Sequence, residues 1–179
     1  MMAGNLSDAT GLDGVVEVIK RTSVNPNIQW VFVGGGNREE WLRERIDKEG
    51  LSKCCSVLGR FPFECMPSLY KQADVMFISL KPTTFQHLEQ TIPARLQSYI
   101  AAGKPVVGMI GEGAANLIKE IDCGICVDAG AVEACAAKIL QIADDPSQLQ
   151  RWGNNARSYY LKHYTRARCI DRLIDITLK

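Results

Sequence analysis

The sequence predicts an α/β protein, a Rossmann-like, doubly wound parallel sheet of about six strands with extra helices at the C-terminal end. Short apolar runs alternate with amphipathic stretches along the chain, and glycine follows several of the runs. The 179 residues, with 46% hydrophobic and 23% charged, suffice for one folded domain with a core. In such a fold a ligand binds in the crevice at the carboxyl ends of the strands.

Short, continuously apolar runs are typical of parallel strands that are buried on both faces. The chain also begins within a strand, because residues 1–6 are interpreted as a strand and its loop, and we therefore expect a domain to be missing before it. The other five predicted strands are residues 28–33, 55–58, 74–78, 105–109 and 124–127.

Apolar residues at helical spacing, with charges on the opposite face, predict a helix after most of these strands. Beyond Asp145-Pro146, two further helices are expected, over residues 147–164 and 166–178, with a break at Thr165. We therefore divide the chain into a Rossmann-like domain, residues 1–145, and C-terminal helices, residues 146–179, whose aromatic residues indicate packing on the sheet or on the missing domain. The earlier helices are predicted over residues 12–22, 38–48, 66–72, 92–102, 114–121 and 131–143.

Residues 91–108 combine a loop, a helix and a strand around a candidate anion site. Pro93 and Gly103 mark the two ends of the helix. The backbone N–H groups of Ala94 and Arg95 then lie at the helix start, where they and the helix dipole attract phosphate. Arg95 could add a bidentate charged contact. An ordinary crossover helix with a well-formed cap explains these local features equally well.

Glycine recurs where the predicted strands end, at Gly4, at residues 34–36 and at Gly59. Glycine permits positive φ and lets the backbone approach a ligand closely, although a tight turn is the commoner explanation. A dinucleotide fingerprint is weak, because Glu39 stands where its third glycine is required and the run follows the second strand.

The predicted fourth strand is followed by a longer irregular segment, residues 79–90, which leads to the helix of the candidate anion site. A longer loop inside a compact domain is often functional. Lys81 lies at its start and Arg95 beyond its end, so two cations could converge on one crevice. A surface lysine that points into water is an equally good interpretation of Lys81.

The formal net charge of +1 favours neither nucleic acid nor an anionic membrane as the main partner. The odd number of cysteines, seven, indicates a reducing, cytoplasmic compartment. Cys123 and Cys126 have the spacing of a redox or zinc pair, and Cys54-Cys55 could join His87 and His163. Buried, unliganded thiols are the favoured interpretation, so no metal site is expected. The apolar runs are too short to span a membrane.

Four motifs follow one another along the chain: Gly4-Asn5-Leu6 with Gly11-Leu12-Asp13, residues 30–36, residues 66–70 with Ala73-Asp74-Val75, and residues 101–107. In order and spacing they resemble the C-terminal, donor-binding domain of GT-B-fold retaining glycosyltransferases of the glycosyl transferases group 1 type. The resemblance covers nearly the whole chain and is greatest to the bacterial group that builds cell-surface polysaccharides such as lipopolysaccharide.

The resemblance implies transfer of a sugar, with retention, from a nucleoside diphosphate sugar to a glycan or lipid-linked acceptor. A uridine-based donor is expected, with no metal or other cofactor. The acceptor would be held by a missing N-terminal domain, so this domain alone is expected to bind the donor without catalysis. The location implied is cytoplasmic, with peripheral association at the inner face of the membrane through the full-length protein and no insertion by this domain.

The sequence departs from the family at its best-known positions. An E-x7-E pair, whose second glutamate holds the ribose hydroxyls, corresponds here to Gln90 and Ser98. The arginine and lysine that neutralise the diphosphate correspond to Asn5 and Thr10. A subgroup with S-L-K-x-x-x and T-I-P-[SA]-[KR]-x-Q-S-Y is the better match, at residues 79–84 and 91–99.

The resemblance implies that Lys81 and Arg95 act catalytically by neutralising the diphosphate, together with the amides of the helix start. Gln97 or Ser98 would replace the ribose carboxylate. Arg60 is expected beside the base, with a surface salt bridge as the alternative. The full set of expected donor-binding residues is Gly4, Asn5, Gly34, Gly35, Arg60, Thr91, Ile92, Pro93, Ala94, Gln97 and Ser98.

A second hypothesis is a standalone nucleotide-sensing or regulatory α/β module without catalysis. It accounts for the absent glutamates and needs no further domain. A flavodoxin-like signalling receiver is disfavoured, because no acidic cluster follows the first strand.

Overall fold

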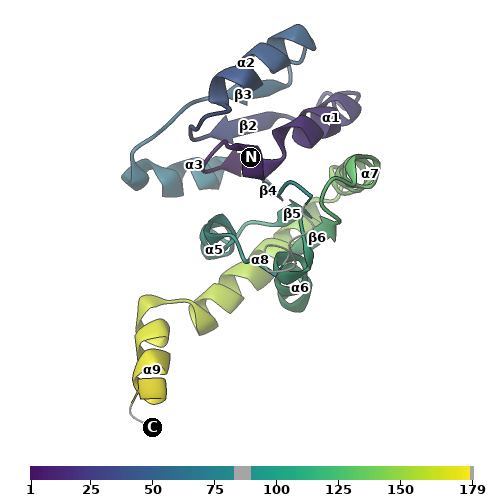
Figure 1. Ribbon diagram of the computed structural model, residues 1–179. Coiled ribbons are helices and arrows are strands. Elements are labelled where there is room, and N and C mark those ends of the chain that lie inside the picture. The colour runs from purple at the N-terminus through teal and green to yellow at the C-terminus, as the bar shows by residue number, and fades with distance from the viewer. Residues whose placement is uncertain (83–89, 178–179) are drawn as a thin grey trace.

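The computed structural model describes residues 1–82 and 90–177 and has the predicted α/β architecture, with parallel strands throughout. Two three-stranded sheets are ordered β1-β2-β3 and β4-β5-β6, with helices around them (Figure 1). The strands of the first sheet are β1 (Met2–Ala3), β2 (Trp30–Val33) and β3 (Cys55–Val57). Those of the second are β4 (Met76–Ser79), β5 (Val106–Met109) and β6 (Gly124–Val127).

The two sheets meet at the N-terminal residue. The Met1 amino group donates to the Val75 carbonyl oxygen at 2.7 Å, and the Phe77 N–H donates to the Met1 carbonyl oxygen, also at 2.7 Å. The strands therefore follow the order β3-β2-β1-β4-β5-β6, in which successive strands run outward from the middle in both directions. In folds with this reversal, ligands bind outside the carboxyl ends of the strands at the point of reversal, which here are the ends of β1 and β4.

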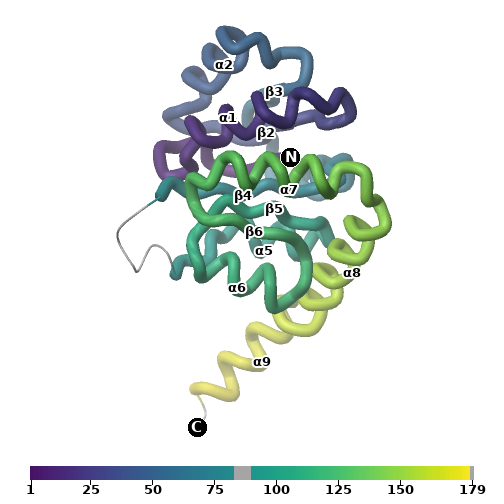
Figure 2. The backbone as a smooth tube through the Cα atoms, turned by 90° about the vertical axis from the view of Figure 1, so that its right-hand side faces the viewer, coloured from purple at the N-terminus to yellow at the C-terminus, as the bar shows by residue number. Residues whose placement is uncertain are grey.

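Helices cover both sheets, as the period of the apolar residues predicts. Helices α1 and α7 pack against each other across the junction of the two sheets, and α5 packs against α8 (Figures 1 and 2). The helices are α1 (Leu12–Thr22), α2 (Glu39–Lys48), α3 (Met66–Gln72), α5 (Ala94–Ala101), α6 (Glu112–Ile121), α7 (Val132–Ile142), α8 (Pro146–His163) and α9 (Arg166–Thr177), with 3₁₀ turns η1 (Asp8–Thr10) and η2 (Phe63–Cys65).

All residues of β4 and β5 are buried, as expected for parallel strands between two layers of helices. One apolar cluster contains Phe32 of β2 with Leu42 of α2, and a second contains Ile78 of β4 with Tyr99 of α5. The predicted strands and helices differ from the observed ones by two residues at most at either end. Helix ends fray on this scale, so these differences do not alter the architecture.

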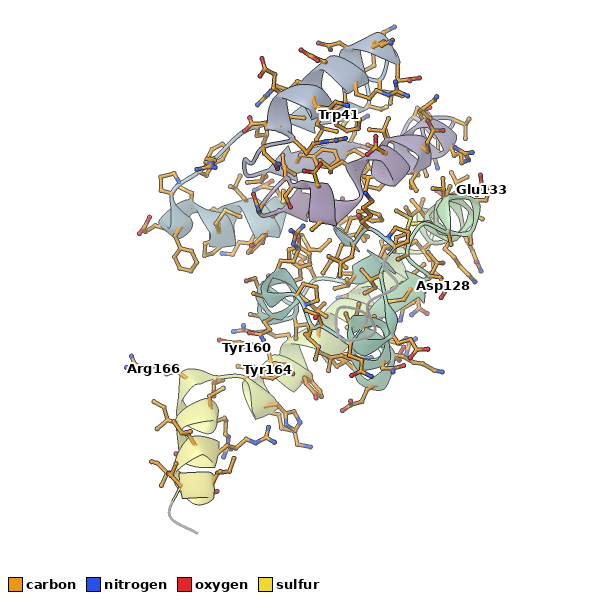
Figure 3. All side chains as sticks on the ribbon, in the orientation of Figure 1. Trp41, Asp128, Glu133, Tyr160, Tyr164 and Arg166 are labelled. Carbon is orange, nitrogen blue, oxygen red and sulfur yellow. The ribbon has the colours of Figure 1, made fainter. Side chains whose placement is uncertain are left out.

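The two C-terminal helices differ in how they contact the domain. Trp152, Gly153 and Ala156 of α8 are buried, and the Trp152 indole N–H donates to Asp122 at 3.2 Å. Helix α9 has no buried residue and extends away from both sheets (Figures 1 and 2). Figure 3 shows the change of direction between Tyr164 and Arg166, at the predicted break. None of the helices in the part of the chain described here combines the length and the apolar character needed to cross a membrane.

All seven cysteines are free. No group of three His, Cys, Asp or Glu side chains within residues 1–82 and 90–177 is arranged to hold a metal ion, and His87 lies outside these ranges. Burial raises the pKa of four thiols to about 12, those of Cys55, Cys123, Cys126 and Cys135. Cys123 and Cys126 therefore lack the low pKa of a redox-active pair.

We expect Cys65 and Cys169, which are exposed, to react first with iodoacetamide near about pH 8. The four thiols with a raised pKa carry almost no thiolate at that pH and should be modified only after unfolding. Peptide mass spectrometry after native and denaturing labelling measures this order. Rapid modification of Cys123 in the native chain would contradict it.

Candidate functional site

Backbone hydrogen bonds join the loops at the carboxyl ends of β1, β2 and β3. The Gly4 N–H donates to the Val33 carbonyl oxygen at 2.8 Å, and the Gly34 N–H donates to the Gly59 carbonyl oxygen at 2.8 Å. Three of the glycines adopt positive φ, +130° at Gly4, +134° at Gly34 and +78° at Gly59. The glycines predicted at the strand exits therefore lie side by side, in three hydrogen-bonded loops along one edge of the sheet.

Two of these glycines are required by close packing. A Cβ atom on Gly34 would lie 1.9 Å from the Gly4 carbonyl oxygen, and one on Gly36 would lie 2.1 Å from the Leu6 carbonyl oxygen. Both contacts are with backbone, which a side-chain rotation cannot relieve. The β1 loop therefore lies directly against the β2 loop, with no room for side chains between them.

Arg95 reaches from the start of α5 to the β1 loop. Its Nη2 donates to the Asn5 carbonyl oxygen at 3.1 Å, and its guanidinium carbon lies 3.5 Å from the position of a Cβ on Gly4. Nη1 is buried and has no hydrogen-bond partner among the described residues. Buried donors almost always have a partner, so this unsatisfied N–H makes Arg95 a candidate for binding an anion. Asn5 contributes its backbone carbonyl here.

The start of α5 supports an anion site at the same place. Helix α5 begins at Ala94, and its N-cap residue, Pro93, offers no side-chain acceptor. The backbone amides of Ala94 and Arg95 and the positive end of the helix dipole therefore belong to the same turn as the Arg95 side chain. Thr91 and Ile92, which precede this turn, are exposed.

The backbone of Lys81 is held on η1. Its N–H donates to the Ala9 carbonyl oxygen at 2.9 Å, and the Ser79 hydroxyl donates to the Thr10 carbonyl oxygen. The Lys81 side chain is exposed, and its convergence with Arg95 stays a prediction. The rest of the predicted functional loop, residues 83–89, lies outside the described residues.

Arg60 lies over Gly35 at the end of β3. A Cβ on Gly35 would lie 2.5 Å from the Arg60 Nε and 2.9 Å from Glu39 Oε2. Glu39 is already paired with Arg43 at 2.8 Å. Arg60 is exposed and has no ion pair within the described part of the chain, so its guanidinium is available to stack on a base.

The two candidates for the ribose side differ. Gln97 is exposed, whereas Ser98 is half-buried and faces Tyr70 of α3, whose pKa it lowers. Burial raises the pKa of Tyr70, partly offset by Ser98 and by the charge of Arg95. Tyr70 was not among the residues expected from the sequence, because only the folded chain brings α3 beside α5.

Tyr99 is a second residue of the site that the sequence does not reveal. It is fully buried, and its hydroxyl accepts from the Ala3 N–H at 2.9 Å and donates to the Ala3 carbonyl oxygen at 2.8 Å. Burial raises its pKa to about 12. Tyr99 therefore attaches α5 to the last residue of β1.

Arg38 connects the β1 loop to α2. Its guanidinium pairs with Asp8 at 3.3 Å and with Asp13 at 3.0 Å, and it lies 3.8 Å above the Trp41 ring, which Figure 3 labels. The Arg38 N–H also donates to the Leu6 carbonyl oxygen at 3.1 Å. This cluster fixes η1 relative to the glycines of β2.

A family model described as glycosyl transferases group 1 matches residues 1–159. Among solved structures, a mutant of TarM from S. aureus, in complex with fondaparinux, α-GlcNAc-glycerol and UDP, superposes with a TM-score of 0.81 at 13% identity, over 97% of this chain and 34% of that one. HepE from Anabaena in complex with UDP superposes with a TM-score of 0.77 at 19% identity, over 99% of this chain and 48% of that one. At these identities the likeness concerns the fold.

A cobyric acid synthase from Mycolicibacterium paratuberculosis is 29% identical over an alignment of 148 residues, and the match covers 74% of this chain and 29% of that protein. The chain thus spans less than half the length of each of these three proteins.

Proposed function

The chain belongs to the glycosyl transferases group 1 family, as a C-terminal GT-B domain, and from this membership we propose that it binds the nucleoside diphosphate sugar donor. We propose UDP as the nucleotide, since the TarM and HepE structures contain UDP. The transfer would proceed with retention, without a metal or other cofactor, to a glycan or lipid-linked acceptor in cell-surface polysaccharide synthesis.

The observation that carries this proposal is the buried, unpartnered Nη1 of Arg95 beside the β1 loop. When the glycosidic bond to the donor breaks, negative charge grows on the departing diphosphate. A fixed guanidinium and the amides at the start of α5 stabilise that charge without reorganising during the reaction. Lys81, at the end of β4, would supply a second positive charge.

The remaining expected residues divide between the two ends of the nucleotide. Gly4, Asn5 and Gly34 would let the diphosphate approach the backbone. Arg60 above Gly35 would stack on the base, and Ser98 with Tyr70 would hold the ribose in place of the glutamate found in other members.

The partner that we propose for this domain is an N-terminal, acceptor-binding domain of the same protein. Helix α9 supports this, because Ile170, Leu173, Ile174 and Ile176 are 44%, 61%, 46% and 74% exposed. Apolar side chains gathered on one extended helix indicate a surface that another body covers. The complete enzyme would work in the cytoplasm, peripherally at the inner face of the membrane, and neither membrane insertion nor nucleic-acid binding is proposed for this domain.

We expect saturating UDP to raise the melting temperature of the 179-residue chain by about 5 °C or more, as expected for a ligand at about 100 times its Kd. Arg95→Ala should remove the shift, because it deletes the guanidinium of the proposed diphosphate site. Differential scanning fluorimetry measures both. EDTA should leave the shift unchanged if no metal takes part.

Arg45→Ala is the matched control, since Arg45 of α2 pairs with Glu49 at the C-terminal end of that helix and lies outside the proposed site. This variant should keep the full shift with UDP. The donor-site proposal fails if UDP, GDP and their sugars produce no shift at millimolar concentration.

A further inference from the structure

The junction between the two sheets contains a tyrosine hydroxyl where a strand would be expected. In a parallel strand, alternate residues direct their N–H and C=O groups to the same neighbour. Gly4 bonds to β2, whereas Met1 bonds to Val75 and Phe77 in the β4 segment. Ala3 therefore faces the β4 side, but both of its backbone groups bond to the Tyr99 hydroxyl, at 2.9 and 2.8 Å.

The hydroxyl completes the hydrogen bonding of Ala3 without a strand. A tyrosine hydroxyl can donate and accept at the same time, so one atom satisfies the N–H and the C=O. The ladder between β1 and β4 stops at Met1, and the structure has two three-stranded sheets in place of one continuous sheet. The two sheets separate at Ala3, one residue before Gly4 and the β1 loop.

Arg95 lies one helical turn before Tyr99, and residues four apart share a face of a helix. The Tyr99 hydroxyl is bonded to Ala3, and the Arg95 guanidinium is bonded to Asn5, two residues further along the same segment. These two attachments set the position of α5 against the β1 loop. Displacement of the Tyr99 hydroxyl from Ala3 would therefore shift the Arg95 guanidinium relative to Asn5.

We propose that Tyr99 is a positioning residue for the donor site: its hydroxyl opens the sheet between β1 and β4 and holds Arg95 against the β1 loop, where the diphosphate binds. This inference rests on the proposed function of the site. Tyr99 itself does not touch the donor, because it is fully buried beneath the loop. It acts on the donor through Arg95.

The test is a double-mutant cycle measured by calorimetric titration of UDP into the 179-residue chain. Tyr99→Phe keeps the ring and removes the hydroxyl, and it should weaken UDP binding about tenfold. Arg95→Gln should weaken it about tenfold or more. The double variant should bind no more weakly than Arg95→Gln alone, because Tyr99 acts through the arginine. A purely structural role for Tyr99 would make the two losses multiply.

Tyr159→Phe is the matched control. Tyr159 lies on α8, and its hydroxyl bonds to Glu120 at 3.2 Å. This variant should bind UDP as the unchanged chain does. Retention of full affinity by Tyr99→Phe, or independent losses in the cycle, would overturn the positioning role while leaving the donor site intact. Failure of the unchanged chain to bind UDP would overturn the proposed function and this inference together.

A second measurement does not depend on the folding of Tyr99→Phe. Native-state hydrogen exchange by NMR reports the opening of the Ala3 N–H, whose acceptor is the Tyr99 hydroxyl. UDP anchored on Arg95 should slow this exchange more than tenfold, relative to an amide at the far end of α1. Unchanged exchange at Ala3 with UDP saturating the site would show that the hydroxyl and the donor site are not coupled.

Discussion

Gly34→Ala is expected to lower the free energy of unfolding by more than about 4 kcal/mol, which is above the range of most single substitutions. Gly34 has φ +134°, a backbone conformation that is strained for any residue with a side chain. A Cβ at this position would lie 1.9 Å from the Gly4 carbonyl oxygen. The clash cannot be relieved by moving Gly4, because its N–H is bonded to Val33 at 2.8 Å. Relief therefore requires β1 and β2 to separate.

Substitutions at two other glycines distinguish the backbone clash from the conformational penalty. Gly50 has φ +68°, but a Cβ on it would have no atom within 4 Å, so Gly50→Ala should cost only the conformational penalty, about 1–2 kcal/mol. Gly35→Ala meets the Arg60 side chain, which can swing away, and should cost less than Gly34→Ala. Urea unfolding followed by circular dichroism measures all three. Equal losses for Gly34→Ala and Gly50→Ala would show that the backbone contact is not limiting.

The order of strands and helices could be predicted from the sequence because it depends on local patterns. The apolar run at residues 30–33 and the helical spacing at residues 12–22 each bury one side against the same core, so periodicity identifies both. The division into two sheets could not be predicted. It depends on the hydroxyl of Tyr99 meeting Ala3, 96 residues away in sequence, and a tyrosine among apolar helix positions is indistinguishable from an ordinary core residue.

The candidate site could also be predicted only in part from the sequence. Gly4 and Gly34 were identified because a glycine after a strand is a local signal, and Arg95 because a helix start follows Pro93. The edge-on contact between the rings of Tyr70 and Tyr99 joins α3 to α5 and leaves no pattern in the sequence. Local signals therefore locate the edge of the sheet where a ligand binds, whereas the side chains that support it from other elements become visible only in the folded chain.

Phe32→Ala is expected to lower the free energy of unfolding by about 3–5 kcal/mol, the range for truncation of a buried phenylalanine. Phe32 is fully buried at the third position of β2, the central strand of its sheet, in a cluster with Leu42 and Ile46 of α2. Arg38, the N-cap residue of α2, pairs with Asp8 and Asp13, and this attachment limits the movement of the helix into the space. The cavity therefore persists and adds to the lost transfer free energy.

Phe63→Ala is the matched control, since the Phe63 side chain on η2 is 84% exposed and its removal should change stability by no more than about 0.5 kcal/mol. Urea denaturation of both variants measures the difference. The midpoint should fall with little change in the dependence on urea concentration, because the surface exposed on unfolding is nearly the same. Since a domain of this kind has a total stability of about 5–15 kcal/mol, Phe32→Ala should also weaken UDP binding wherever the variant is partly unfolded. A loss below about 1 kcal/mol would mean that α2 can move toward β2, and that the Arg38 cluster does not hold it in place.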